Sequence, residues 1–152
     1  LYLLLYKIKK MYHILQKAHS GWAYIVLLLL VFAVVNSLVG KSSKKEFTAK
    51  DRKIALFALI ATHLQLVIGL ILYFVSDLGY KQLSGAAMKN AELRLTVLEH
   101  PLVNIIAIVL ITVGWSKHKK AANNESKFNS IFVFYGLGLL LILSRLPWKL
   151  WF

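Results

Sequence analysis

Four long apolar segments dominate this sequence, and they constrain its fold more than any other feature. Each is close to the roughly 20 residues that an α-helix needs to cross the hydrocarbon core of a bilayer. Inside a membrane every backbone polar group has to be satisfied within the segment, so each segment is expected to be a helix. We therefore predict an all-α fold, a four-helix transmembrane bundle that runs up-down-up-down. The predicted spans are 22–39, 54–75, 93–115 and 128–146.

The length of the chain limits its domain organisation. Its 152 residues are 59% hydrophobic, and the four spans with their short loops use nearly all of them. We predict a single transmembrane domain over 1–152, with no separate soluble catalytic domain. The sequence does not open with Met, so we interpret Met11 as the natural start and residues 1–10 as an upstream extension.

The strong positive charge is concentrated in loops. The formal net charge is +13, from 19 Lys and Arg against 6 Asp and Glu. These residues form no basic stripe with interleaved aromatics, so we do not expect nucleic acid as a partner. They gather in the loops 40–53 and 116–127, which the positive-inside rule places in the cytoplasm. The predicted location is a bacterial inner membrane, crossed several times, with both termini outside.

The chain contains no cysteine, which excludes several kinds of chemistry. Disulfides, thiolate catalysis, iron–sulfur clusters and covalent haem attachment all need a cysteine sulfur. Any metal or cofactor has to be held by histidine, carboxylate or another ligand without sulfur.

Ionisable residues inside the apolar spans are the candidate functional residues, because such residues are costly in a membrane and are usually retained for a function. His63 lies near the middle of the second span. Glu99 and His100 lie in the outer half of the third, Arg145 lies near the outer end of the fourth, and His19 precedes the first.

Histidines on facing helices of a bundle suit a b-type haem, which imidazole holds without any covalent link. His63 and His100 are the first choice as metal ligands, since both lie within consecutive spans, and His19 is the alternate. Arg145 lies at a suitable level to bind the haem propionates. A haem with one histidine ligand, or a three-histidine metal site with Glu99, remains open.

Neighbouring polar residues are candidates for a supporting role. Glu99 is either an ion-pair partner of Arg145 or a hydrogen-bond acceptor for a ligating imidazole. Thr96, His100 and Asn104 follow one another at intervals of four, so they share one helix face that should point into the bundle. Gln65 lies off the His63 face and is expected to bond a neighbouring helix. Small residues that allow close packing of helices are Gly69, Gly114, Gly136 and Gly138.

Several short motifs, in their order along the chain, resemble a family of small bacterial four-helix membrane proteins known as cytochrome b. These motifs are Met11–His13, His19–Trp22, Thr62–Gln65, Leu70–Tyr73, Glu99–His100 and Pro147–Trp148. The resemblance covers nearly the whole chain from Met11 onward. It implies haem b, a role in electron transfer, and His19, His63 and His100 as functional positions. The chain departs from the family at Ala23-Tyr24, where a basic residue is expected beside the tryptophan.

The leading interpretation is a haem b protein of electron transport, linked to quinone or forming a subunit of a respiratory complex. Its expected partners are the lipid bilayer, quinone, and either other membrane subunits or a second copy of the chain. One alternative is a structural or accessory membrane subunit without cofactor, whose histidines bond between helices. Another is a membrane enzyme that metabolises haem or porphyrin, so the sequence leaves open whether the protein is an enzyme.

Overall fold

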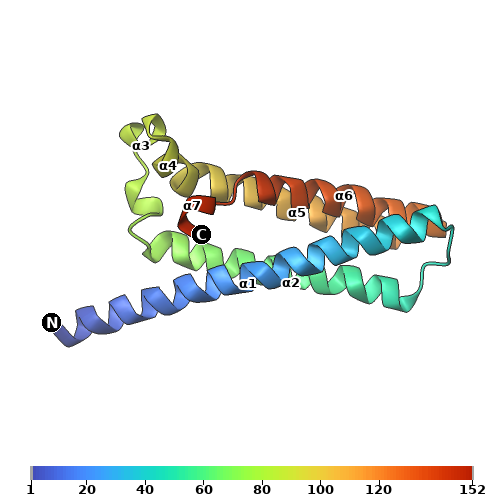
Figure 1. The fold of residues 1–152 in the computed structure, drawn as a ribbon, viewed down its shortest axis with the longest axis horizontal. Helices are drawn as coiled ribbons and strands as arrows, with labels where there is room; N and C mark the ends of the chain where they lie inside the picture. Colours follow the sequence, from blue (N-terminus) through green and yellow to red (C-terminus); the bar gives the residue numbers. More distant parts are fainter. Residues whose placement is uncertain (1, 152) are drawn as a thin grey trace.

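The computed structural model describes residues 2–151, except for the side chains at positions 2, 4 and 5. Every element in this part is helical. α4, the π-helical turn η2 and α5 follow one another without a break, so they form one long helix (Figure 1). The elements are α1 (Tyr2–Ser42), α2 (Ala49–Val75), the 3₁₀ turn η1 (Tyr80–Gln82), α3 (Gly85–Lys89), α4 (Ala91–Arg94), η2 (Leu95–Glu99), α5 (His100–Lys120), α6 (Asn124–Ser144) and α7 (Trp148–Trp151).

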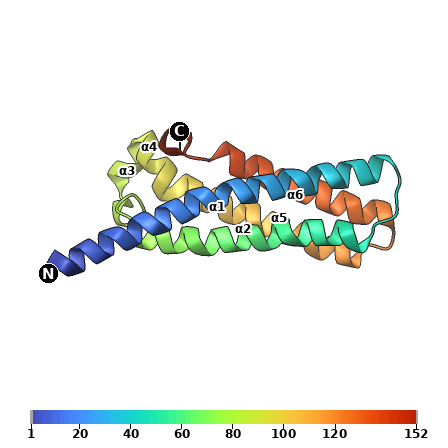
Figure 2. The same ribbon diagram turned by 60° about the horizontal axis from the view of Figure 1, so that its bottom comes forward.

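The long helices form an antiparallel bundle, which confirms the predicted fold. α1 packs against α2 and α6, and α5 packs against the same two helices. The loops between α1 and α2 and between α5 and α6 lie at one end, while α3, α4 and α7 lie at the other (Figures 1 and 2). Four helices are long and apolar enough to cross a membrane, and they are Tyr6–Ser42, Ala49–Val75, Ala91–Lys120 and Asn124–Ser144.

The helix ends differ most from the predicted spans at the first helix, and by two to five residues at several others: α2 begins at Ala49, α5 ends at Lys120 and α6 begins at Asn124. α1 begins at Tyr2, well before the predicted start at position 22, because no proline interrupts the preceding residues. It extends beyond the rest of the bundle at its N-terminal end (Figure 2). α6 ends at Ser144, just before the predicted end at 146. Hydropathy detects the apolar part of a helix and is insensitive to polar turns that continue it.

Pro101 interrupts the hydrogen bonding of the third span, and a π-helical turn precedes it. Proline has no N–H group to donate to the carbonyl of Val97. Val97 is fully buried, and the hydroxyl of Tyr73 on α2 donates a hydrogen bond of 2.8 Å to that carbonyl. The N–H of His100 donates to the carbonyl of Leu95, five residues earlier. Because a π turn changes the rotation of the residues that follow it, this segment helps to set the direction of His100.

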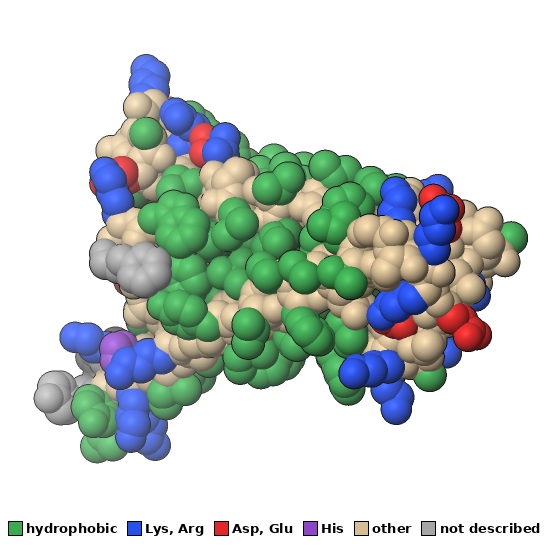
Figure 3. Space-filling view, turned by 45° about the vertical axis from the view of Figure 1, so that its right-hand side comes forward, with side chains coloured by type: hydrophobic (Ala, Val, Ile, Leu, Met, Phe, Trp, Pro, Cys, Tyr) green, Lys and Arg blue, Asp and Glu red, His purple; other side chains and the backbone are tan. Residues whose placement is uncertain are grey.

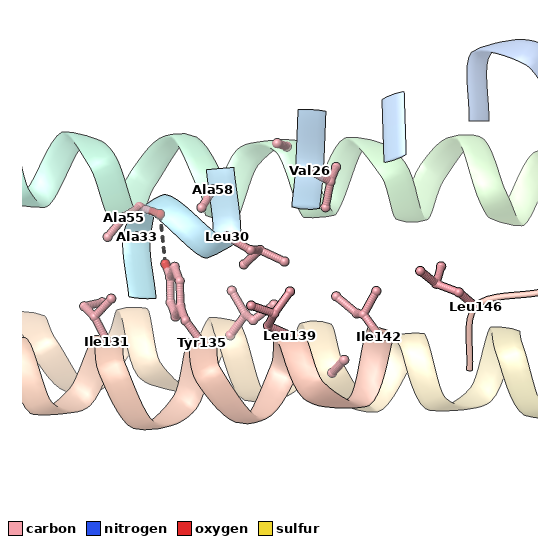
Figure 4. Close-up of a cluster of buried hydrophobic side chains, with 13 residues drawn as sticks. Val26, Leu30, Ala33, Ala55, Ala58, Ile131, Tyr135, Leu139, Ile142 and Leu146 are labelled. Carbon is pink, nitrogen blue, oxygen red and sulfur yellow. Dashed lines mark hydrogen bonds between the residues drawn. The ribbon is translucent and has the colours of Figure 1, made fainter. Parts of the chain in front are cut away.

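The core lies where small side chains of α2 face larger side chains of α1 and α6. Ala55, Ala58 and Ala61 are buried on α2, while Leu30 and Tyr135 are fully buried on the neighbouring helices. The hydroxyl of Tyr135 donates a hydrogen bond of 2.9 Å to the carbonyl of Ala55 (Figure 4). Small residues allow the helices to approach closely, and the bond satisfies a hydroxyl that would otherwise be costly in an apolar interior.

The surface has the pattern of a membrane protein. On the face shown in Figure 3, a broad apolar belt covers the middle, and Lys and Arg side chains gather towards both ends. Large apolar side chains are well exposed in this belt, such as Leu28 at 70% and Leu140 at 65%. An apolar patch of this size is unfavourable in water. It is favourable against lipid tails, so the chain is a multi-pass membrane protein.

Candidate functional site

Two histidines from different helices meet at the end of the bundle that carries α3, α4 and α7. His19 lies on α1 and His100 is the first residue of α5, and both are partly buried. Their ring centroids are 6.2 Å apart, and the ring planes are nearly perpendicular at 86°. The packed helices bring these two imidazoles together although 80 residues lie between His19 and His100 in the sequence.

The fourth helix holds the ring of His100 in place. Its Nδ1 lies 2.8 Å from the backbone carbonyl oxygen of Arg145, the residue that follows α6. A carbonyl can only accept, so Nδ1 carries a proton, and in the neutral imidazole Nε2 keeps its lone pair. The side-chain amide of Asn104 donates to the carbonyl of His100 at 2.6 Å. A neutral imidazole fixed in this way presents Nε2 as a ligand or an acceptor.

The second helix provides the space for His19. A Cβ atom on Gly69 would lie 2.9 Å from Cε1 and 3.4 Å from Nδ1 of His19, so only glycine leaves room for the ring. One turn away, the amide nitrogen of Gln65 donates a hydrogen bond of 2.8 Å to the carbonyl of His19. This bond confirms that Gln65 contacts a neighbouring helix.

Two buried polar atoms beside this pair have no hydrogen-bond partner within the described part of the chain. They are Nδ1 of His19 and the side-chain oxygen Oε1 of Gln65. An unpaired buried polar atom costs about 1–3 kcal/mol, so such atoms usually mark a place where something else binds. Both belong to the lining of one cavity.

That cavity has a volume of about 220 Å³ and lies among α1, α2, α5 and the C-terminal segment. His19 and His100 both line it, and most of its wall is apolar. Thr96, His100 and Asn104 all contribute to the wall, which confirms that this face of the third span points into the bundle. A largely apolar cavity with a few convergent polar groups is the usual form of a small-molecule site.

His63 does not join this cluster. Its side chain is exposed beside the contact of α2 with α5, where Nδ1 lies 2.8 Å from the carbonyl of Leu59 and Nε2 lies 3.3 Å from the hydroxyl of Thr112 on α5. The structure therefore brings His19, rather than His63, to His100. The inward face of α2 carries Thr62, Gln65 and Gly69.

Glu92 and Glu99, at the end of the bundle with α3, α4 and α7, form ion pairs with nearby cations. Glu99 accepts from Arg94 at 2.7 Å and lies 3.4 Å from Nε of Arg145, so it is an ion-pair partner rather than an acceptor for His100. Arg145 contacts His100 through its backbone carbonyl and not through its charged side chain, on which the sequence prediction was based. Lys149 on α7 donates to Glu92 at 2.7 Å, and this hydrogen bond raises the pKa of Lys149 above its usual value.

A metal site built from protein ligands alone does not form. Among the residues that the structure describes, no group of three or more His, Asp or Glu side chains is placed to hold a metal ion. The alternative of a three-histidine site with Glu99 is therefore not supported.

Gly69 belongs to the site, although its sequence context predicted only close packing of helices. Gly69 was interpreted as a general packing residue, but its closest neighbour is the ring of His19. The spacing of Thr62, Gln65 and Gly69, at intervals of three and four, was the signal that could have identified the inward face of α2. His118 is a second residue whose place the sequence does not indicate: it lies beside a basic loop, and only 2% of it is exposed.

Comparison with known proteins gives no assignment. No protein-family model, curated protein or solved structure matches this chain.

Proposed function

We propose that this protein binds a b-type haem between His19 and His100 and takes part in electron transfer within the membrane. The observation that carries the proposal is the distance between the two imidazole centroids, 6.2 Å. An imidazole nitrogen lies about 2 Å from the metal that it binds, and the ring centre lies about 1 Å further away. Two imidazoles on opposite sides of one ion would therefore have centroids about 6 Å apart.

The donor set supports haem over a free metal ion. Porphyrin supplies four nitrogens to the iron, so one or two histidines complete its coordination. The chain offers two facing histidines, no thiolate, and no group of three ligands among the described residues. When bound, haem would supply one-electron redox chemistry.

The residues around His19 and His100 support the proposal because they fix the positions of the two rings. The Arg145 carbonyl fixes the tautomer of His100, and Gly69 leaves the space that the His19 ring occupies. The apolar cavity wall would exclude water from a bound porphyrin. Arg145 and Lys149 lie near the outer end, where propionates need cations, although each is paired with a glutamate in this structure.

The proposed setting is a bacterial inner membrane with the basic loops in the cytoplasm. Both loops lie at one end of the bundle (Figure 1), as the positive-inside rule requires for a shared side. We propose quinone as the redox partner, because it is soluble in lipid and the cavity is mostly apolar. A larger respiratory complex or a second copy of the chain are further candidate partners.

The test is a haem titration of the full chain with three variants. Wild-type protein from haem-replete cells should show a b-type reduced-minus-oxidised spectrum and near-stoichiometric haem. His19→Ala and His100→Ala should each lose most of this haem. His63→Ala is the matched control, since His63 is an exposed membrane histidine outside the cavity, and it should keep the spectrum.

Other outcomes would replace the proposal. A wild-type protein without haem would leave the accessory-subunit interpretation. Consumption of added porphyrin by the reconstituted protein would favour the enzyme interpretation. Loss of haem in His63→Ala alone would restore the ligand pair that the sequence first indicated.

A further inference from the structure

A second cleft lies at the opposite end of the bundle, beside the two basic loops. It has a volume of about 450 Å³ and lies between the start of α2 and the junction of α5 with α6. Arg52, Lys119 and Lys127 line it, and no carboxylate belongs to its wall. This cleft shares no residue with the cavity at His19 and His100.

The three cations are not neutralised by the chain. None of the ion pairs within the described residues involves Arg52, Lys119 or Lys127. Asp51, next to Arg52 in the sequence, is buried, and its carboxylate accepts from Lys45, from Thr48 and from Asn36 on α1. Three cations gathered around one hollow repel each other, and an anion in the hollow would relieve that repulsion.

The surrounding side chains fix two of these cations over one aromatic ring. The guanidinium of Arg52 lies 5.7 Å from the ring centroid of Trp115, and the ammonium of Lys119 lies 5.8 Å from it. Cation–π contacts of this kind hold a charged group in place and leave its N–H groups available. The cleft is therefore partly preorganised.

The N-terminus of α2 and His118 complete the wall of the cleft. Thr48 and Ala49 line it where the helix dipole is positive, and the N–H and hydroxyl of Thr48 both donate to the carboxylate of Asp51 in a capping box. His118 forms part of the wall and is 2% exposed, with its ring centroid 4.4 Å from Trp115 and 5.6 Å from Phe47. A buried polar ring between two aromatics gives the cleft a rigid side.

We propose that this cleft binds a phosphate group, with Arg52, Lys119 and Lys127 as its cationic ligands. Phosphate suits the site because its oxygens accept from several N–H donors at once. An anionic phospholipid would place its phosphate at this level, since basic pockets on the cytoplasmic side of membrane helices bind such headgroups. Free inorganic phosphate offers the same chemistry. The proposal is independent of haem.

The experiment is native mass spectrometry of the full chain in detergent, titrated separately with phosphatidylglycerol, phosphatidylcholine and inorganic phosphate. Wild-type protein should bind phosphatidylglycerol about tenfold or more tightly than phosphatidylcholine, because each basic residue near an anionic headgroup contributes roughly a fewfold. The triple variant Arg52→Gln, Lys119→Gln, Lys127→Gln should lose this preference. The triple variant Lys50→Gln, Lys53→Gln, Lys120→Gln removes the same charge from exposed positions outside the cleft and should keep it.

The source of the phosphate is decided by competition. Displacement of phosphatidylglycerol by millimolar inorganic phosphate would identify a site for the free anion, and resistance would identify a lipid site. Equal losses in the two triple variants, or no preference in the wild type, would overturn the proposal. Thermal unfolding checks that each variant folds. If the cleft variant does not fold, the single change Lys127→Gln, compared with Lys120→Gln, gives the same comparison.

Discussion

At the scale of single residues, Gly69 on α2 has no side chain, and this leaves room for the ring of His19 on α1 to reach the cavity. The position that its Cβ would take lies 2.9 Å from the ring of His19. Gly136, also within a long helix, has open space at the corresponding position. The two glycines look alike in sequence, and both were expected to serve packing, yet only Gly69 contacts a site residue.

We predict that Gly69→Ala destabilises the bundle by about 1 kcal/mol or more, as overpacking of a filled position usually does. The added methyl would also push the His19 ring away from α2. Thermal unfolding in detergent measures the loss. Gly136→Ala is the control, and it should be neutral or stabilising by about 0.5 kcal/mol, because alanine is the better helix former. Equal effects of the two changes would contradict the packing argument.

At the scale of elements, the junction of η2 and α5 sets the position of His100. Pro101 leaves the buried carbonyl of Val97 without its helical donor, and Tyr73 of α2 provides one. The same bond fastens the third span to the second at the level of the cavity. The π turn, the proline and the tyrosine therefore act as one unit.

We predict that Tyr73→Phe destabilises the protein by about 1–3 kcal/mol, since it leaves the carbonyl of Val97 buried without a partner. In a Pro101→Ala background the new backbone N–H would compensate. The cost of Tyr73→Phe should therefore fall clearly there, and a double-mutant cycle of unfolding free energies measures the difference. Strict additivity of the two changes would show that the tyrosine bond has no connection with the proline.

At the scale of the whole molecule, the distribution of charge relates the bundle to its membrane. The basic α1–α2 and α5–α6 loops lie at one end of the bundle, and the apolar belt separates them from the end with α3, α4 and α7 (Figures 1 and 3). A segregation of Lys and Arg in short loops determines orientation during insertion. The end with the basic loops also carries the proposed phosphate cleft.

We predict that the α5–α6 loop is cytoplasmic and that the α2–α3 connection is outside. Because the chain has no cysteine, a single added thiol reports its own location. Ala122→Cys should be protected from a membrane-impermeant thiol reagent in intact cells, and Lys81→Cys should react. Both positions are exposed, so access to the reagent differs only through the membrane. The reverse labelling pattern would invert the topology.

The fold was largely predictable because a membrane leaves few choices. Four uninterrupted apolar segments must be helices, and short loops between them require neighbours that run in opposite directions. The inward face of the third span was also predictable, since Thr96, His100 and Asn104 repeat at helical spacing and all line the cavity. The length of α1 was not, because its polar N-terminal turns give no hydropathy signal.

The partner of His100 was not predictable, because it depends on the rotation of each helix about its own axis. His63 and Gln65 are two residues apart, yet one side chain is exposed beside α5 and the other lies against α1. The π turn before Pro101 and the end of α6 then set the angle and the anchor of the His100 ring.

The sequence by itself determined that this chain forms membrane helices, because satisfying the backbone in lipid is a local requirement that each segment meets alone. Only the tertiary structure decided that His19 faces His100, that Arg145 contributes a carbonyl rather than its charge, and that His118 is buried. The physical reason is that these contacts join residues on different helices, and their geometry exists only once the helices are packed.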